Sequence, residues 1–110
     1  MLAHVSRHAY IGDGTIVMHR VIVNSGARIG KNCILNTGSL LEHDVRVGDH
    51  THVSTSTVIN GDAWIGSGCF VGSHATIIQG LRLPDHYFFR AGSLVTGEAQ
   101  GKIIRDRHDV

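Results

Sequence analysis

The sequence predicts an all-β protein, a parallel β-helix in which short strands wrap into a three-sided coil. Two regularities indicate this fold: an aliphatic side chain recurs every six residues, and an aliphatic residue followed by glycine recurs every eighteen. Neither the 3.6-residue period of a helix nor the two-residue period of a plain strand explains such spacing. The internal repeat therefore decides the fold class.

Each six-residue unit places two side chains toward the interior. Four residues after each aliphatic position stands a mostly small side chain, such as Ala27, Cys33 or Thr51, with Tyr87 among the larger exceptions. One large and one small inward residue per unit fit a short strand followed by a turn. The series at the first inward position is Val5, Ile11, Val17, Val23, Ile29, Leu35, Leu41, Val47, Val53, Ile59, Ile65, Val71, Ile77, Leu83, Phe89 and Val95.

A second period of eighteen residues appears in the pairs at 11–12, 29–30, 47–48 and 65–66, each an aliphatic residue before glycine. Three units therefore complete one turn, and about five coils stack as parallel strands about 4.8 Å apart. Glycine here is explained by positive φ or by close backbone approach. We expect the coil to span residues 5–95 and a C-terminal tail or cap to span 96–110.

Composition limits the classes of partner. The 110 residues indicate one domain, and ten Lys plus Arg against nine Asp plus Glu give a net charge of +1 without a basic run. Nucleic acid and acidic membrane surfaces are therefore not expected as partners. No long apolar segment and no signal sequence follows Met1, so we expect a soluble, cytoplasmic protein.

The two cysteines fit the interior of the coil. Cys33 and Cys69 are two coils apart on one inward column, which separates them by about 9.6 Å at the spacing of stacked strands. A disulfide requires Cα atoms within roughly 7 Å of each other. We predict two free core thiols.

The outward residues of 35–53 carry the candidate chemistry. His43 lies in a turn, and Gly61 stands one coil above it, leaving open space over the imidazole and a backbone N–H beside it. Acyl transfer needs a base with a pKa near the working pH and an N–H donor for the developing oxyanion. A carboxylate beside the ring would orient it, and Asp44 and Glu42 both flank His43. The alternative is a solvated surface histidine between two acids.

A family resemblance extends this interpretation. Residues 36–53 read NTGSLLEHDVRVGDHTHV, 60–62 read NGD and 65–72 read IGSGCFVG. This combination resembles the active coil of the bacterial sugar O- and N-acetyltransferases of the sialic-acid and bacillosamine type, over roughly residues 17–95. That resemblance implies a left-handed coil, a homotrimer with active sites between neighbouring prisms, acetyl-CoA as the acetyl donor and a sugar-like acceptor. No metal is expected.

The same resemblance assigns residue roles. His43 would be the general base, Asp44 the acid that raises its basicity, and Gly61 our candidate oxyanion donor. Asn36 and His52 would help to place acetyl-CoA and the acceptor. The resemblance places coenzyme contacts at Ser73 and Ala91, and Gly72 would let the thin pantetheine chain approach.

Two departures from the family stand out. The family usually carries an amino-terminal nucleotide-sugar-binding domain, whereas this sequence begins directly at the first coil, which leaves acceptor recognition open. Its usual Gly-x-Pro-Ala-Lys segment near the adenine is replaced by GEAQGK at 97–102. Coenzyme affinity is then weaker, or the adenine is held differently.

Two other functions fit the same fold. A carbonic anhydrase would need three histidine ligands, and here His50 and His86 lie two coils apart while position 91 is alanine, so one ligand is missing. A non-catalytic binding or structural β-helix is the other alternative, because a fold does not imply an activity. Trp64 should face outward, where we expect a subunit contact.

Overall fold

The computed structural model describes residues 2–96, and every secondary-structure element in that part of the chain is a short strand. The sixteen strands form three parallel sheets that make the sides of a prism. Strands of one sheet are eighteen residues apart in the sequence, because Ile22 pairs with Leu40 and Leu40 with Val58. The predicted eighteen-residue coil is therefore confirmed.

The sheets are named A, B and C in the order in which the chain visits them. Sheet A contains β1 (His4–Val5), β4 (Ile22–Val23), β7 (Leu40–Leu41), β10 (Val58–Ile59), β13 (Thr76–Ile77) and β16 (Leu94–Val95). Sheet B contains β2 (Tyr10–Ile11), β5 (Arg28–Ile29), β8 (Arg46–Val47), β11 (Trp64–Ile65) and β14 (Arg82–Leu83). Sheet C contains β3 (Ile16–Val17), β6 (Ile34–Leu35), β9 (His52–Val53), β12 (Phe70–Val71) and β15 (Phe88–Phe89).

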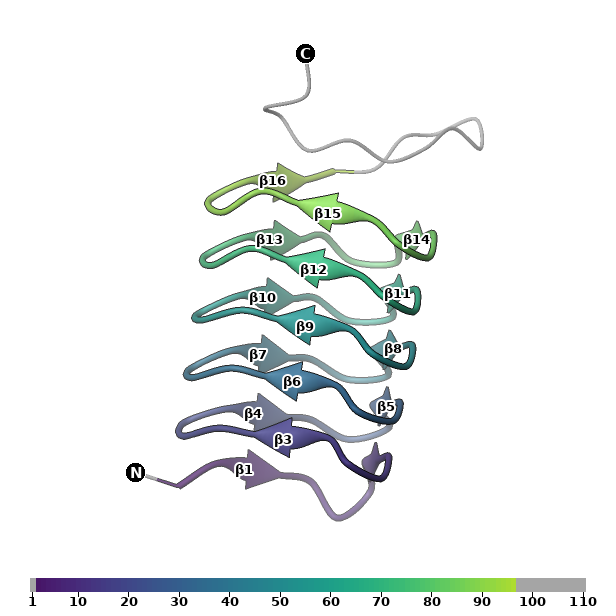
Figure 1. Cartoon of the computed structure of the whole chain (residues 1–110). Helices are drawn as coiled ribbons and strands as arrows, with labels where there is room; N and C mark the ends of the chain where they lie inside the picture. Colours follow the sequence, from purple (N-terminus) through teal and green to yellow (C-terminus); the bar gives the residue numbers. More distant parts are fainter. Residues whose placement is uncertain (1, 97–110) are drawn as a thin grey trace.

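The coil is left-handed. In Figure 1 the chain rises from β1 to β16, while the distant strands of sheet A run to the right and the near strands of sheet C run to the left. Seen from the upper end, the chain turns clockwise as it approaches the viewer, which is the left-handed sense. The predicted fold class, a left-handed parallel β-helix of hexapeptide repeats with about five coils, is confirmed.

The core is the stack of first inward residues predicted from the sequence. From Val23 to Val95 every member of this series is at most 5% exposed. At the amino-terminal end Val5 is 37% exposed, because no coil lies beneath it. The second inward column is narrow, and the Thr51 hydroxyl within it donates to the Gly66 carbonyl at 2.7 Å and accepts the Cys69 N–H at 3.1 Å.

The cysteines are core thiols, as predicted. Both are buried and free. The Sγ atom of Cys33 lies 3.1 Å from the Gly48 carbonyl oxygen, and that of Cys69 lies 3.2 Å from the Pro84 oxygen. Burial, as the largest cause, raises the pKa of both thiols. Neither thiol is suited to act as a nucleophile.

The turns follow the same six-residue rhythm. The third residue of each turn has positive φ at every sixth position from 14 to 92, and eight of these residues are not glycine. The glycines predicted to mark the corners do not stand at this position. A Cβ atom at Gly48 would lie 2.6 Å from the Ser67 nitrogen, so close approach of the next coil, not positive φ, explains that glycine.

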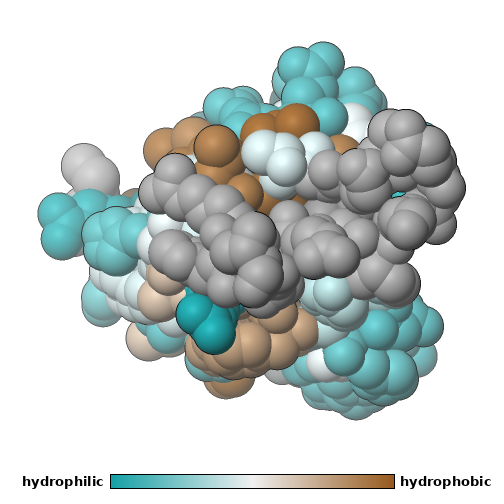
Figure 2. All heavy atoms as spheres, turned by 90° about the horizontal axis from the view of Figure 1, so that it is seen from above, coloured by the Kyte–Doolittle hydropathy of each residue, from teal (hydrophilic) through white to brown (hydrophobic). Residues whose placement is uncertain are grey.

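The three outer faces differ in chemistry. Sheet A presents a mainly aliphatic column that includes Ile22, 40% exposed, Leu40 and Val58. Sheet C presents His52 below Phe70 and Phe88. Seen along the axis, hydrophobic atoms gather in separate patches at the perimeter, with hydrophilic atoms between them (Figure 2). Sheet B presents Tyr10, Arg28, Arg46, Trp64 and Arg82.

Residues 2–96 contain no helix with the length and apolar character needed to cross a membrane. The tail expected at 96–110 lies, apart from Thr96, outside the described residues.

Candidate active site

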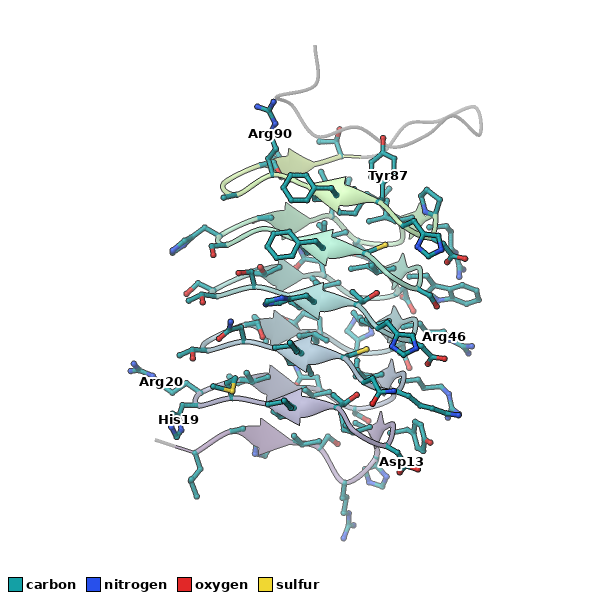
Figure 3. The ribbon with its side chains drawn as sticks, viewed as in Figure 1. Asp13, His19, Arg20, Arg46, Tyr87 and Arg90 are labelled. Carbon is teal, nitrogen blue, oxygen red and sulfur yellow. The ribbon has the colours of Figure 1, made fainter. Side chains whose placement is uncertain are left out.

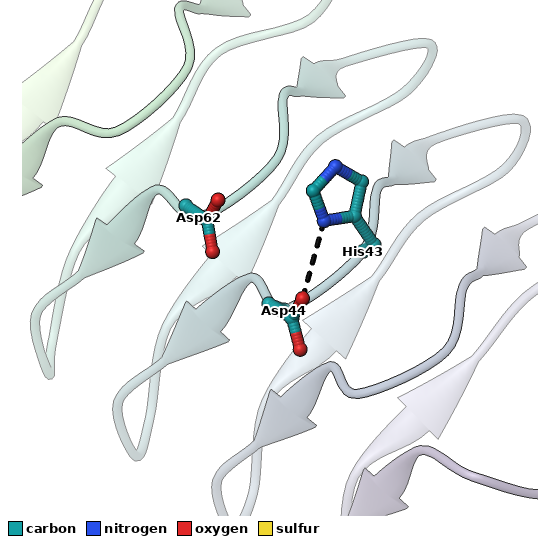
Figure 4. Close-up of side chains that lie close together, drawn as sticks. All are labelled: His43, Asp44 and Asp62. Atoms are coloured by element: carbon teal, nitrogen blue, oxygen red, sulfur yellow. Dashed lines mark hydrogen bonds and ion pairs between the residues drawn. The ribbon is translucent and has the colours of Figure 1, made fainter.

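His43 lies on the edge between sheets A and B, called edge AB. The turn between β7 and β8 holds it as second residue, and Asp44 follows at a φ of 60°. This backbone turns the Asp44 carboxylate back toward the ring, so that Oδ2 lies 3.2 Å from His43 Nδ1 (Figure 4). An ionised carboxylate only accepts hydrogen bonds, so this contact favours the tautomer with the hydrogen on Nδ1, which in a neutral ring leaves the lone pair on Nε2.

Glu42, the other acid beside His43, has a different partner. Its Oε1 accepts a hydrogen bond from Asn24 Nδ2 at 2.8 Å, one coil below. The sequence left open which carboxylate orients the ring. In the structure Asp44 does so.

Gly61 lies one coil above His43 and is in direct contact with its ring. A Cβ atom at Gly61 would lie 2.5 Å from Nε2 and 2.7 Å from Cε1 of the imidazole. The space that the sequence suggested was open is therefore filled by the ring itself, and any larger residue at this position would displace the ring. The Gly61 carbonyl accepts the Gly80 N–H at 3.0 Å, while within residues 2–96 the Gly61 N–H has no backbone acceptor.

The site is open to solvent in the single chain. The side chains of His43 and Asp44 are 57% and 58% exposed. A histidine–carboxylate contact exposed to this degree contributes little to stability, because water screens it. The pair therefore matters for the orientation of the ring and not for the fold.

Asp62 is a neighbour of this pair that the sequence reasoning missed. Potential ligand atoms of His43, Asp44 and Asp62 all lie within 4.8 Å of one another, the only such group of three within residues 2–96 (Figure 4). All three residues are exposed, and such clusters are common without a metal. The signal was available in the sequence, because Asp62 follows Asp44 by eighteen residues and so stands directly above it.

A different edge, between sheets C and A, is called edge CA. It carries four of the other expected residues: Asn36, Gly72, Ser73 and Ala91. Asn36 Oδ1 accepts the Thr37 N–H at 2.7 Å. The Ser73 hydroxyl is 2.9 Å from the Ser54 hydroxyl. A Cβ atom at Gly72 would lie 2.7 Å from Ala91 Cα, so packing between coils explains this glycine without a ligand.

His52 lies on sheet C. Its ring packs edge-on against Phe70 with centroids 5.0 Å apart, and Phe70 stacks on Phe88 at 5.3 Å. The Nε2 atom of His52 is shielded from solvent and has no hydrogen-bond partner. Within one chain the expected site residues are thus divided between edge AB, sheet C and edge CA, and the structure does not bring them together.

The histidines of the carbonic anhydrase alternative lie on the third edge. His50 and His86 both follow strands of sheet B and have positive φ. Neither belongs to a group of three possible metal ligands in the described part of the chain.

Comparison of the sequence with protein families supplies the deciding observation. The model described as bacterial transferase hexapeptide (six repeats) matches residues 8–43 and 44–79. The chain belongs to the bacterial transferase hexapeptide family. The matched part contains edge AB with His43, Asp44 and Gly61. Comparison with curated proteins finds no match.

Solved structures of acetyltransferases resemble the chain. The acetyltransferase domain of PglB from Neisseria gonorrhoeae, in complex with acetyl coenzyme A, is 28% identical with a TM-score of 0.84, over 86% of this chain and 46% of that one. PerB from Caulobacter crescentus, in complex with CoA and GDP-perosamine, is 32% identical with a TM-score of 0.81, over 82% and 44%. Serine acetyltransferase from Neisseria gonorrhoeae, at 16% identity and a TM-score of 0.68, shares the fold. The chain spans less than half the length of these proteins.

Proposed function

We propose that this protein transfers an acetyl group from acetyl-CoA to an amine or hydroxyl group of a sugar-like acceptor. The observation that carries the proposal is the orientation of His43, whose Nδ1 faces Asp44 while Nε2 lies against Gly61. A base held by a carboxylate, next to a backbone N–H without an acceptor, is what direct acyl transfer requires. The similarity to PglB and PerB, solved with acetyl-CoA or CoA, supports the choice of donor.

The reaction proceeds without an acyl-enzyme. His43 Nε2 removes the proton as the acceptor nitrogen or oxygen attacks the thioester carbonyl carbon. The tetrahedral intermediate then collapses, the carbon–sulfur bond breaks, and the CoA sulfur takes the proton from His43. Cys33 and Cys69 are buried in the core, so neither can accept the acetyl group first.

Asp44 and Gly61 support opposite charges during this step. The Asp44 carboxylate stabilises the imidazolium that forms when His43 takes the proton. The Gly61 N–H would donate to the oxyanion that grows on the thioester oxygen. Because a fixed donor needs no reorganisation as the charge develops, its contribution is large even for one hydrogen bond.

A homotrimer would complete this site. Edges AB and CA border the same sheet, and the exposed column of sheet A is largely aliphatic, with Ile22 40% exposed and Leu40 and Val58 partly exposed. If three copies turn sheet A toward a common axis, edge AB of one meets edge CA of the next. His43 then faces Asn36 and Ser73 of the neighbouring copy.

This arrangement gives roles to the remaining residues. Asn36 and His52 would place acetyl-CoA and the acceptor, and pantetheine would run along edge CA past Gly72, Ser73 and Ala91. Because acetyl-CoA is an intracellular metabolite, a cytoplasmic location follows from the proposal.

The test separates coenzyme binding from turnover in the full chain and in the variant His43→Ala. Calorimetry should give micromolar acetyl-CoA binding for both proteins, because His43 is proposed as a base and not as a coenzyme anchor. Turnover, followed as release of the CoA thiol with amino-sugar acceptors including GDP-perosamine, should fall at least a hundredfold in the variant.

Sedimentation of the same samples tests the trimer. Turnover at the parent rate in the variant would refute the role of His43. Absence of acetyl-CoA binding by the parent protein would refute the donor, and a monomer that is fully active would refute the shared site.

A further inference from the structure

The outer face of sheet B carries a column of cations and aromatic rings that neither the proposed acetyl transfer nor the proposed trimer uses. Its members, paired in register on successive strands, are Tyr10, Arg28, Arg46, Trp64 and Arg82. All five side chains are exposed, Tyr10 by 51% and Trp64 by 40%. Figure 3 shows Arg46 on the side of the prism that lies away from Arg20. The face is therefore open to a ligand in the single chain.

The aromatic rings hold the arginine side chains in place. The guanidinium carbon of Arg28 lies 5.2 Å from the centre of the Tyr10 ring. Those of Arg46 and Arg82 lie 4.6 and 3.5 Å from the centre of the Trp64 ring. Since β11 lies between β8 and β14, the two cations reach Trp64 from the strands on either side. Such contacts order long side chains before a ligand arrives, which lowers the entropy cost of binding.

No carboxylate neutralises these guanidinium groups within residues 2–96. The one contact between a basic side chain and a carboxylate in that range lies on edge AB. Asp85 borders the face, but its Oδ1 accepts a backbone N–H at 2.8 Å. Arg28 and Arg46 are direct strand partners, and like charges in that position destabilise a sheet. An acidic ligand would remove this repulsion.

The length of the face fits an extended peptide. A cavity follows it from Tyr10 on β2 to Arg82 on β14, four strand steps of about 4.8 Å each, or roughly 19 Å. Six residues of extended chain cover that length at about 3.3 Å per residue. Arg28 and Arg82 are three steps, or about 14 Å, apart, and the first and fifth side chains of a strand lie on one side about 13 Å apart. Acids at every second position would therefore meet the arginines from one end to the other.

The composition of the face is typical of protein interfaces. Tyr, Trp and Arg are the residue types enriched at binding hot spots, and every cation that lines the cavity is an arginine. Guanidinium groups bind carboxylates with paired N–H donors. A second copy of the chain does not offer a matching acidic strand, because none of the strands described in residues 2–96 contains Asp or Glu.

We propose that the outer face of sheet B docks an extended acidic segment of a partner protein, with Asp or Glu at alternate positions. The carboxylates pair with the three arginines, and the backbone of the segment passes over Trp64. Trp64 faces outward, as the sequence predicted, and it meets a partner protein instead of another subunit. The inference is independent of acetyl transfer, because neither His43 nor Asp44 lines this cavity.

Trp64 allows a direct measurement, because it is the only tryptophan in the chain. Its fluorescence is recorded while a seven-residue peptide of alternating serine and glutamate is added to the full chain. The emission should change saturably below millimolar peptide, with an affinity that falls as salt is raised. A peptide of the same composition with its glutamates adjacent should bind roughly fivefold more weakly, because its acids cannot span the arginines.

The variants Arg46→Gln and Arg82→Gln should each weaken peptide binding roughly tenfold. Calorimetry measures this, because both arginines contact Trp64 and their loss would itself change the emission. Arg20→Gln is the matched control, since Arg20 is an exposed arginine on edge CA, and it should change the affinity by less than about twofold. All three variants should keep the urea midpoint of the parent, because exposed substitutions of this kind barely change stability.

Several results would overturn the proposal. No binding at millimolar peptide would do so, as would equal weakening by Arg20→Gln, which would show non-specific attraction. Pyrophosphate binding without peptide binding would indicate a site for small anions, and an oligomer that dissociates in Trp64→Ala would place a second copy on this face; either excludes the proposed partner.

The variant His43→Ala separates this inference from the reaction. It should bind the peptide like the parent protein, because His43 is not part of the sheet B cavity. Acetyl transfer without peptide binding would refute the docking surface alone, and peptide binding without acetyl transfer would refute the proposed reaction alone.

Discussion

Replacement of Gly61 by alanine tests the active site without disturbing the fold. Gly61 does not have the positive φ that excludes other residues, and the three atoms nearest to an added Cβ all belong to the His43 ring. The contact to Nε2 must open from 2.5 Å to the ordinary range of 3.4–4 Å, so the ring moves by about 1 Å. A displacement of that size lowers turnover about a hundredfold.

Stability should not follow activity in this variant. The His43 ring is more than half exposed and can move into solvent, and Gly→Ala at a compatible backbone adds about 0.4–1 kcal/mol to the free energy of unfolding. Denaturant unfolding should therefore show an unchanged or slightly raised midpoint. The CoA thiol release rate should fall while the acetyl-CoA dissociation constant from calorimetry stays within twofold.

A double-mutant cycle identifies the cause of the loss. If Gly61→Ala acts by displacing His43, it should have no further effect on turnover in a His43→Ala background. A full hundredfold loss in that background would mean that alanine disturbs the coenzyme or the Gly61 N–H instead. Parent turnover in the single variant would contradict the contact between the ring and Gly61.

Three further predictions concern the neighbouring chemistry and the core. Asp44→Asn should lower kcat by roughly tenfold to a hundredfold with little change in KM for acetyl-CoA, because the imidazolium loses its counter-charge; equal kcat values in steady-state assays would exclude this role. Leu35→Ala, at a fully buried position, should lower the free energy of unfolding by about 2–5 kcal/mol, and Ile34→Ala on the same strand but facing outward by less than half as much, as measured by urea unfolding. Burial raises the pKa of Cys33 and Cys69 above that of an unfolded thiol. The stabilising contribution of the two thiols is therefore complete below the unfolded pKa and is lost as pH rises through the higher folded pKa. At alkaline pH the free energy of unfolding should fall more steeply in the parent than in the Cys33→Ala, Cys69→Ala double variant.

The sequence predicts the fold so completely because the inward positions must repeat. An aliphatic residue stands at every sixth position, and a small residue stands four positions after it. Both can be buried if the chain wraps around a narrow triangular core. The same periodicity predicts which residues stand above one another, and so placed Gly61 over His43 and set Cys33 and Cys69 two coils apart. Even the outward direction of Trp64 follows from it.

Side-chain directions on the outside could not be predicted in this way. The choice of Asp44 over Glu42 depends on the positive φ at Asp44 and on the bond from Asn24 to Glu42, neither of which changes the inward pattern. The positions of the Arg46 and Arg82 guanidinium groups over the Trp64 ring likewise depend on the rotamers of these side chains. The repeat within one chain also cannot predict how copies of the chain would contact one another.

Edge AB carries His43 on one coil and Gly61 on the next, and this spacing has a consequence for how such proteins can change in length. Each coil is hydrogen-bonded only to its two neighbours, so a whole eighteen-residue coil inserted near either end would lengthen the column and leave the reacting groups as they are. The same insertion between Asp44 and Gly61 would move the Gly61 N–H one coil further from the His43 imidazole. Growth is thus permitted toward the two ends of the column and not within the coils that carry the site.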